Sequence, residues 1–164
     1  MAISVIALGG NLGDPQYAIH SALDVIHEHP KVKVLQRSRL VESHALTTSG
    51  IDKSKPNYLN AVAQLETELT PEELLRFLNS VELGFGRVRE ERWASRTLDI
   101  DIITFGNQLV DTPELVIPHP RAHLRGFVLT PWLDMDPEAE LLGHGKVADL
   151  AAPLAGEVWF YEAN

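Results

Sequence analysis

Cysteine is absent from all 164 residues of the chain, and no apolar run is long enough to cross a membrane. The missing cysteine excludes a disulfide framework, a thiolate nucleophile and a cysteine-ligated zinc site. The N-terminal segment MAISVIALGGNLGD has no basic flank, so it is predicted to be a first strand and not a signal peptide. A cytoplasmic protein that does not bind membranes is expected.

Positive charge is also scarce. The chain has 14 Lys and Arg against 23 Asp and Glu, which gives a formal net charge of −9. General binders of nucleic acid or anionic membranes use broad basic faces, so neither partner is expected. An anionic small molecule would have to meet a local basic cluster. With 45% hydrophobic residues a chain of this length buries one core, so we expect a single domain over 1–164 and a monomer.

Helices are expected to be dispersed among strands. Asp14 before Pro15 predicts one helix start, and Thr70-Pro71-Glu72-Glu73 predicts another as a capping box. Alternation of apolar residues indicates the strands. Strands that must partly pair antiparallel, with helices between them, favour an α+β sandwich. The predicted elements are strands at 3–8, 32–41, 58–66, 97–103 and 158–161, helices after Asp14 and Thr70, a polar loop over 42–56, a hairpin turn at Asn107 and short helical pieces beyond it.

An Asp-x-Asp pair lies in the predicted strand 97–103. Residues two apart on a strand project to the same face, about 6.6 to 7 Å apart, so Asp99 and Asp101 can converge on a cation while their apolar neighbours point to the core. Mg²⁺ suits such a pair because it keeps several waters and takes few protein carboxylates plus substrate phosphates. Asp is disfavoured in strands, so two of them on one strand favour a functional role for the pair. A solvated strand face is the alternative.

Arginine supplies the local positive charge. Every basic residue between 56 and 145 is an arginine, and six of the seven lie in two segments that flank the Asp pair. Guanidinium groups present planar forks that suit phosphate oxygens. Together with the carboxylates they predict an arginine and metal clamp around a polyphosphate. Ordinary ion pairing with Glu90 and Glu91 is the alternative.

Two common nucleotide-binding motifs are missing. The chain has no Gly-x4-Gly-Lys-Ser/Thr, and Gly9–Gly13 lacks the Gly-x-Gly-x-x-Gly spacing, so P-loop and dinucleotide-binding folds are excluded. Gly9 and Gly10 are interpreted as a tight turn, with close approach of the backbone to another group as the alternative.

The segment RWASRTLDIDII, residues 92–103, resembles the signature of the 6-hydroxymethyl-7,8-dihydropterin pyrophosphokinase family. The likeness covers essentially the whole chain. It implies a ferredoxin-like α+β sandwich, an antiparallel-rich sheet with packed helices, and transfer of the β,γ-diphosphate of ATP to the pterin hydroxymethyl group, with release of AMP, in folate biosynthesis. The further segments that carry it are Ala7–Asp14, Asn57–Ala61, Glu82 with Gly86–Arg89, and Pro118–Arg121 with Arg125–Leu129.

The resemblance also implies roles for individual residues. Asp99 and Asp101 would hold two Mg²⁺ ions, and Arg87 and Arg92 would act on the transferred phosphates. Glu82 has either a role at the site or a structural role at a helix end. The expected nucleotide contacts are Arg89, Arg96, Ile102, His119, Arg121 and Arg125.

The pterin is expected to lie between aromatic faces. By resemblance Trp93 and Phe127 would sandwich the ring, and Asn60 would bond its polar edge. For Phe127 and Tyr58 core packing is the alternative. The full set of expected pterin contacts is Ser43, His44, Leu46, Tyr58, Asn60, Trp93 and Phe127.

Two departures from the family pattern stand out. Gly10 replaces the usual serine, and Ser43-His44-Ala45-Leu46-Thr47 replaces a Thr-Pro-Pro-Leu-Gly type of pterin loop. Proline restricts the unbound chain, so a loop without it is expected to order less readily and to bind pterin more weakly.

Three other functions stay open. The Asp-x-Asp pair also fits another two-metal nucleotidyltransferase or phosphatase. His119 and His123 have the spacing of helical zinc ligands, although prolines flank the first and no third ligand is evident. A paralogue that binds pterin or nucleotide without catalysis is the third, which the retained metal and arginine positions disfavour.

Overall fold

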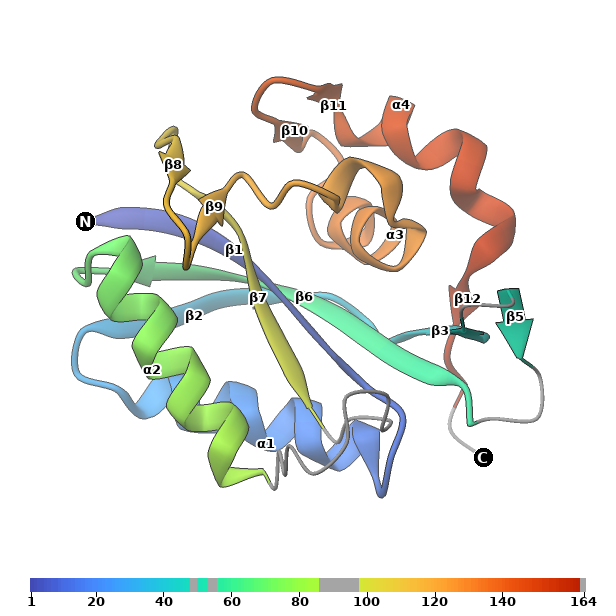
Figure 1. Ribbon diagram of the computed structural model, residues 1–164, viewed down its shortest axis with the longest axis horizontal. Helices are drawn as coiled ribbons and strands as arrows, with labels where there is room; N and C mark the ends of the chain where they lie inside the picture. Colours follow the sequence, from blue (N-terminus) through green and yellow to red (C-terminus); the bar gives the residue numbers. More distant parts are fainter. Residues whose placement is uncertain (48–49, 53–55, 86–97, 163–164) are drawn as a thin grey trace.

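The computed structural model describes residues 1–47, 50–52, 56–85 and 98–162. One antiparallel sheet carries helices on both faces (Figure 1). The elements are β1 (Ala2–Gly10), α1 (Pro15–Glu28), β2 (Val32–Arg37), β3 (Val41–Ser43), β4 (Ala45–Thr47), β5 (Gly50–Asp52), β6 (Tyr58–Thr67), α2 (Pro71–Gly84), β7 (Asp99–Phe105), β8 (Val110–Asp111), β9 (Val116–Ile117), α3 (Gly126–Met135), β10 (Glu140–Leu141), β11 (Gly145–Lys146), α4 (Val147–Ala151) and β12 (Trp159–Phe160), with 3-10 helices at Ala122–Leu124 and Ala152–Glu157.

The main sheet has the order β12-β3-β6-β1-β7, and β2 pairs with β6 beside β3. All of these pairs are antiparallel. The chain order β1-α1-β2-β6-α2-β7 with β1 between β6 and β7 is the ferredoxin-like arrangement. The expected fold class is therefore confirmed.

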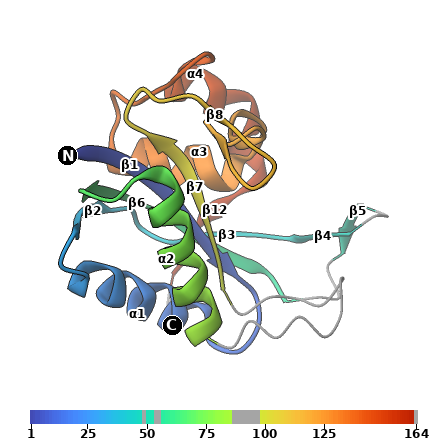
Figure 2. The ribbon, with the colours of Figure 1, turned by 60° about the vertical axis from the view of Figure 1, so that its left-hand side comes forward.

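Helices α1 and α2 cover one face of the sheet and α3 and α4 lie on the other (Figure 2), and each face carries an apolar core. Ile6 and Leu8 belong to the core beneath α1 and α2, whereas Val5, Val62 and Ile103 pack with α3 and α4. This division follows from strand geometry, because successive side chains point to opposite faces. A central sheet buried on both faces leaves little room for polar side chains, so polar residues on its strands mark the part of a face that no helix covers.

The sequence predicts both helix starts correctly. Asp14 accepts a hydrogen bond from the Tyr17 amide at 3.0 Å, which caps α1. At α2 the Thr70 hydroxyl accepts from the Glu73 amide at 3.1 Å, and the Glu73 carboxylate accepts from the Thr70 amide at 2.9 Å. Each bond satisfies an amide that the helix itself leaves unpaired.

The predicted strand 32–41 is two strands in the structure. β2 ends at Arg37 and β3 begins at Val41. Between them Ser38 exchanges two hydrogen bonds with Val62, and Arg39 turns outward to bind Asp134 of α3 at 2.7 Å. The register therefore shifts between the two strands, as in a bulge.

The predicted loop 42–56 is wrong in part. Its beginning continues β3, and β4 and β5 pair as a two-stranded hairpin. These two strands pair through their backbone groups, which the polar composition of the segment does not predict. The turn at Asn107 does follow β7, but β8 pairs with β9 and not with β7, so the expected hairpin is wrong in its partner. Short helices and a final strand do follow it, and no helix in the described part of the chain is long and apolar enough to span a membrane.

Candidate active site

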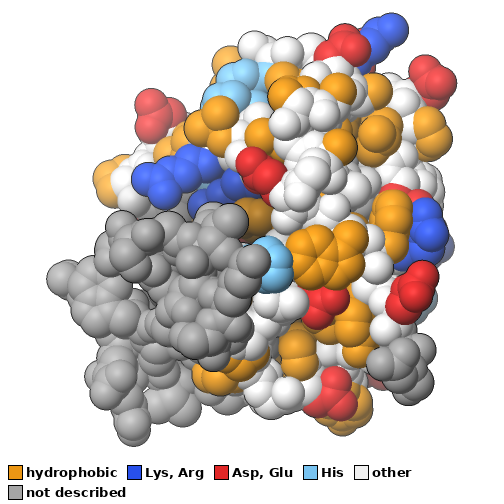
Figure 3. Space-filling model, turned by 90° about the vertical axis from the view of Figure 1, so that its right-hand side faces the viewer, with side chains coloured by type: hydrophobic (Ala, Val, Ile, Leu, Met, Phe, Trp, Pro, Cys, Tyr) orange, Lys and Arg blue, Asp and Glu red, His pale blue; other side chains and the backbone are white. Residues whose placement is uncertain are grey.

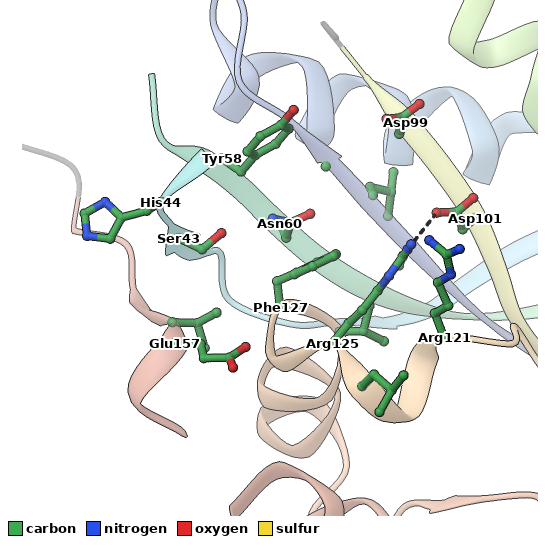
Figure 4. Close-up of a pocket in the computed structure, with 16 residues that line it drawn as sticks. Ser43, His44, Tyr58, Asn60, Asp99, Asp101, Arg121, Arg125, Phe127 and Glu157 are labelled. Atoms are coloured by element: carbon green, nitrogen blue, oxygen red, sulfur yellow. Dashed lines mark ion pairs between the residues drawn. The ribbon is translucent and has the colours of Figure 1, made fainter. Parts of the chain in front are cut away.

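A cleft of about 590 Å³ opens on the face of the sheet that carries α3, beyond the end of that helix (Figure 4). The residues that line it come from β1, β3 and the His44 that follows it, β6, β7 and the two segments 121–128 and 157–158. Figure 3 shows Lys and Arg side chains gathered on this side of the molecule, next to residues that are not described. The lining residues are Ala7, Leu8, Gly9, Ser43, His44, Tyr58, Asn60, Asp99, Asp101, Arg121, Leu124, Arg125, Phe127, Val128, Glu157 and Val158.

Strand register brings the polar residues together. Gly9 of β1 lies opposite Asn60 of β6 on one side and Asp99 of β7 on the other. The glycine is needed here, because a Cβ at this position would overlap the Asn60 side-chain oxygen. Asn60, only 8% exposed, therefore lies across the glycine backbone. The alternative interpretation of the glycine pair, a close approach of backbone to another group, is the correct one for Gly9.

Asp99 and Asp101 both face the cleft from β7, as the alternation of the strand predicts. The side chain of Asp101 is 48% exposed, and its Oδ2 lies 4.0 Å from Nη1 of Arg125. This separation is a loose ion pair and leaves the Asp101 carboxylate accessible. Two carboxylates on one strand face are a donor set that Mg²⁺ accepts, so the residues fit the expected metal.

Glu82 supports the strand that carries the Asp pair. β7 is an edge strand, and the amide of Ile100, between the two aspartates, donates to Oε2 of Glu82 at 2.8 Å. Glu82 belongs to α2 and is 3% exposed. A buried carboxylate therefore takes the place of a neighbouring strand. This contact supports the structural interpretation of Glu82 at a helix end, and a role of Glu82 at the site stays a prediction.

Three basic residues lie near the Asp pair. Arg125 extends between Asp101 and the ring of Phe127, with its guanidinium carbon 5.5 Å from the ring centre. Arg121 points to the same end of the cleft (Figure 4). Nδ1 of His119 accepts a hydrogen bond from the Arg121 amide at 3.2 Å, so neutral His119 carries its proton on Nε2.

The pKa of His119 lies below its ordinary value. Burial is the largest cause, because it disfavours the charged form, and the positive charges of Arg125 and Arg121 act in the same direction. The carboxylate of Asp101 opposes them. His119 is therefore predominantly neutral near pH 7.

The opposite end of the cleft is aromatic and amide-rich. Phe127 from α3 and Tyr58 from β6 flank Asn60, and Ser43 with His44 completes this wall (Figure 4). A flat ring fits between aromatic faces, and the Asn60 amide offers both a donor and an acceptor to its edge. The cleft thus has an acidic and basic end and an aromatic end.

Most described site residues that the sequence predicts come together here. Ile102 does not line the cleft, because its side chain is 4% exposed and packs in the core beneath α1 and α2. Strand alternation explains this, since Ile102 follows Asp101 and points to the other face. A contact with the nucleotide would have to come from the Ile102 backbone, and it stays a prediction. Leu46 lies in β4. The predicted residues Arg87, Arg89, Arg92, Trp93 and Arg96 lie outside the described residues.

Sequence reasoning missed several residues of the cleft. Glu157 and Val158 line it from a segment far along the chain, where the sequence carries no motif. Gly9 had a signal in the glycine pair after the first strand. Within the described residues no group of three acidic or histidine side chains could hold a metal, and His123 stacks on His144 with ring centres 4.0 Å apart. The zinc alternative has no third ligand there.

The sequence profile of the family 7,8-dihydro-6-hydroxymethylpterin-pyrophosphokinase (HPPK) matches residues 5–137. The 2-amino-4-hydroxy-6-hydroxymethyldihydropteridine pyrophosphokinase of Pseudomonas aeruginosa is 42% identical over 90% of this chain and 88% of its own. The protein of the same name from Haemophilus influenzae is 38% identical over 94% of both chains.

A solved structure shares the fold. The HPPK-DHPS of Plasmodium falciparum, crystallised with pteroate, superposes with a TM-score of 0.72 at 15% sequence identity and covers 94% of this chain. This chain spans 42% of that longer one. At such low identity the likeness concerns the fold alone.

Proposed function

Because the chain belongs to the HPPK family, we propose that the cleft on the α3 face is the place where it acts. The enzyme transfers the β,γ-diphosphate of ATP to the hydroxymethyl group of 6-hydroxymethyl-7,8-dihydropterin in folate biosynthesis, and AMP is the other product. The observation that supports the cleft is the shared row of Asn60, Gly9 and Asp99 across three strands. This row joins an amide suited to a pterin edge to a carboxylate suited to a cation.

The acidic and basic end is the proposed nucleotide end. Asp99 and Asp101 would hold two Mg²⁺ ions, which supply charge neutralisation at the triphosphate oxygens. Arg125 and Arg121 would bind phosphate oxygens, and Arg125 already lies near Asp101. Neutral His119 would donate from Nε2 to the nucleotide, because its Nδ1 is engaged by the Arg121 amide. From outside the described residues, Arg87, Arg89, Arg92 and Arg96 would add guanidinium groups.

The aromatic end is the proposed pterin end. Phe127 would stack on one face of the ring, with Trp93 proposed for the other. Asn60 would bond the ring edge, beside Tyr58 and Ser43. This placement brings the pterin hydroxymethyl group toward the Asp pair on the same sheet face. Such phosphoryl transfer depends on alignment and charge stabilisation, so no protein nucleophile is required.

The test is a product assay with ATP, Mg²⁺ and 6-hydroxymethyl-7,8-dihydropterin. We expect equimolar AMP and pterin diphosphate. ADP or inorganic phosphate in place of AMP would instead support another two-metal phosphate enzyme. Pterin and ATP binding without turnover would support the non-catalytic paralogue.

Substitution of the Asp pair tests the site itself. Asp99→Asn and Asp101→Asn should each lower kcat by at least about a hundredfold, because metal-held charge contributes several kcal/mol to the transition state. The fold should persist. Asp111→Asn on exposed β8 is the matched control and should retain wild-type turnover. Full activity of either cleft variant would contradict the proposed site.

We further propose that the chain works as a monomer in the cytoplasm. Light scattering after gel filtration should give a mass near 18.2 kDa. A dimer mass at assay concentrations would overturn the first part, and recovery of the protein with membranes would overturn the second.

A further inference from the structure

Four side chains form a closed network beside the aromatic end of the cleft. The Trp159 indole N–H donates to Oε1 of Glu42 at 2.7 Å, and the Asn57 amide nitrogen donates to Oε2 of the same carboxylate at 3.4 Å. Nδ1 of His44 lies 3.3 Å from the Asn57 amide oxygen. The His44 and Trp159 rings then meet edge to face, with centres 5.0 Å apart, which closes the ring of contacts.

The network joins three segments that make one wall of the cleft. Ser43, Tyr58 and Val158 each line the cleft, and each is the direct chain neighbour of a network residue. β12 places Trp159 opposite Glu42 in the sheet. His44 itself lines the cleft. The network therefore lies immediately behind the wall and includes one of its residues.

The chemistry of the network fixes the direction of each hydrogen bond. The Glu42 carboxylate only accepts, so the Asn57 amide nitrogen must face it and the Asn57 oxygen must face His44. His44 then donates from Nδ1. The network orients the His44 ring and sets its neutral tautomer, with the proton on Nδ1.

We propose that Trp159, Glu42 and Asn57 are positioning residues that hold His44 in the wall of the pterin end, so that strand β12 takes part in recognition of the acceptor. The inference rests on the proposed assignment of this end to pterin. It concerns the segment where histidine and alanine replace the two prolines of the family pattern. In this chain the hydrogen-bonded network would fix the conformation of the segment, as the two prolines would in the family pattern.

The test is Trp159→Phe, which retains an aromatic ring against His44 and removes only the hydrogen bond to Glu42. We expect the KM for the pterin to rise about five- to tenfold, in line with the loss of one hydrogen bond of ordinary net strength, because Trp159 is partly exposed. KM for ATP and kcat should stay within about twofold. Phe160→Leu is the matched control, because Phe160 lies on the same strand and contacts Arg39 instead; it should leave the KM for pterin unchanged.

Two further measurements separate positioning from general stability. His44→Ala should raise the KM for pterin to a similar extent, and the double variant with Trp159→Phe should be no worse than His44→Ala alone, because the indole acts through the imidazole. Glu42→Gln puts an amide nitrogen in place of one carboxylate oxygen. Either one hydrogen bond of the network is lost, or the Asn57 amide turns over and donates to Nδ1 of His44 instead of accepting from it. ¹⁵N spectra should then show a changed His44 tautomer population.

Several outcomes would overturn the inference. Unchanged pterin KM in Trp159→Phe, additive effects in the double variant, or an equal rise in both KM values would each do so. A wild-type enzyme that forms no AMP from ATP and pterin would instead contradict the proposed function. The two failures are thus distinguishable in one set of assays.

Discussion

Gly9 shows how an absent side chain shapes the cleft at the scale of one residue. A Cβ there would overlap the Asn60 oxygen and approach the Asn60 side-chain carbon at 2.9 Å. The flexible end of Asn60 would give way before the backbone does. A methyl group at this position should therefore turn the Asn60 side chain aside and change the stability of the fold little.

We accordingly predict that Gly9→Ala raises the KM for pterin at least about tenfold, as expected when a buried hydrogen-bond partner is misplaced. The unfolding midpoint in urea should fall only slightly. Gly84→Ala is the control, since a Cβ there meets nothing within 4 Å; Gly84 is the last residue of α2, so alanine there should change the unfolding free energy by less than about 1 kcal/mol. Wild-type pterin kinetics in Gly9→Ala would contradict the role given to Asn60.

His119 gives a prediction about pH. Its pKa is lowered in the folded state, chiefly by burial, so the unfolded chain binds the proton first as pH falls. The stabilisation is fully present above the ordinary value of 6.5 and is lost as pH falls through the lower folded value. Between about pH 8 and about pH 5, wild type should lose more unfolding free energy than His119→Asn. Urea titrations without metal or nucleotide test this, and parallel pH profiles would contradict it.

At the scale of elements, Glu82 links α2 to the edge of β7. Glu82→Ala would leave the buried Ile100 amide without this acceptor, which we expect to cost about 1 to 3 kcal/mol of unfolding free energy. The aspartates on either side should then be held less firmly, so kcat should fall as well. Glu72→Ala, at an exposed position in the first turn of α2, is a suitable control. A loss of stability with unchanged kcat would limit Glu82 to a structural role.

Sequence patterns predicted the elements where local chemistry decides them. Asp14 and Thr70 cap their helices because the cap needs only residues within one turn. The β4 and β5 hairpin escaped prediction because its polar residues pair through backbone groups that composition does not reveal. Ser38 likewise breaks a strand through contacts with Val62, twenty-four positions away.

For the candidate site, too, the sequence predicted the residues that follow from local strand geometry and missed those that only the fold brings in. Alternation placed Asp99 and Asp101 on one face, and the same rule turns the side chain of Ile102 to the other face. Glu157 could not be found, because only the fold brings that segment to the cleft. The expectation that a loop without prolines orders less readily and binds pterin more weakly stays a prediction, although part of that loop is paired as β4 and β5.

At the scale of the whole molecule, the sheet separates support from chemistry. Helices α1 and α2 bury one face with a core that includes Leu74 and Leu78, both fully buried. The other face is shared between the core of α3 and the cleft. Cleft substitutions on that face should therefore cost little stability, which makes kinetic effects interpretable as effects on the site.

The strand order also has a consequence for biosynthesis. β12 pairs with β3, yet it follows every other strand of the main sheet in the sequence. During translation the strands of the nucleotide end, β1 and β7, emerge well before the one that completes the opposite wall. A nascent chain that lacks residues from 158 on, and that is tethered by a linker long enough to bring residue 157 out of the exit tunnel, should thus already bind ATP on the ribosome, while competence for the acceptor requires β12.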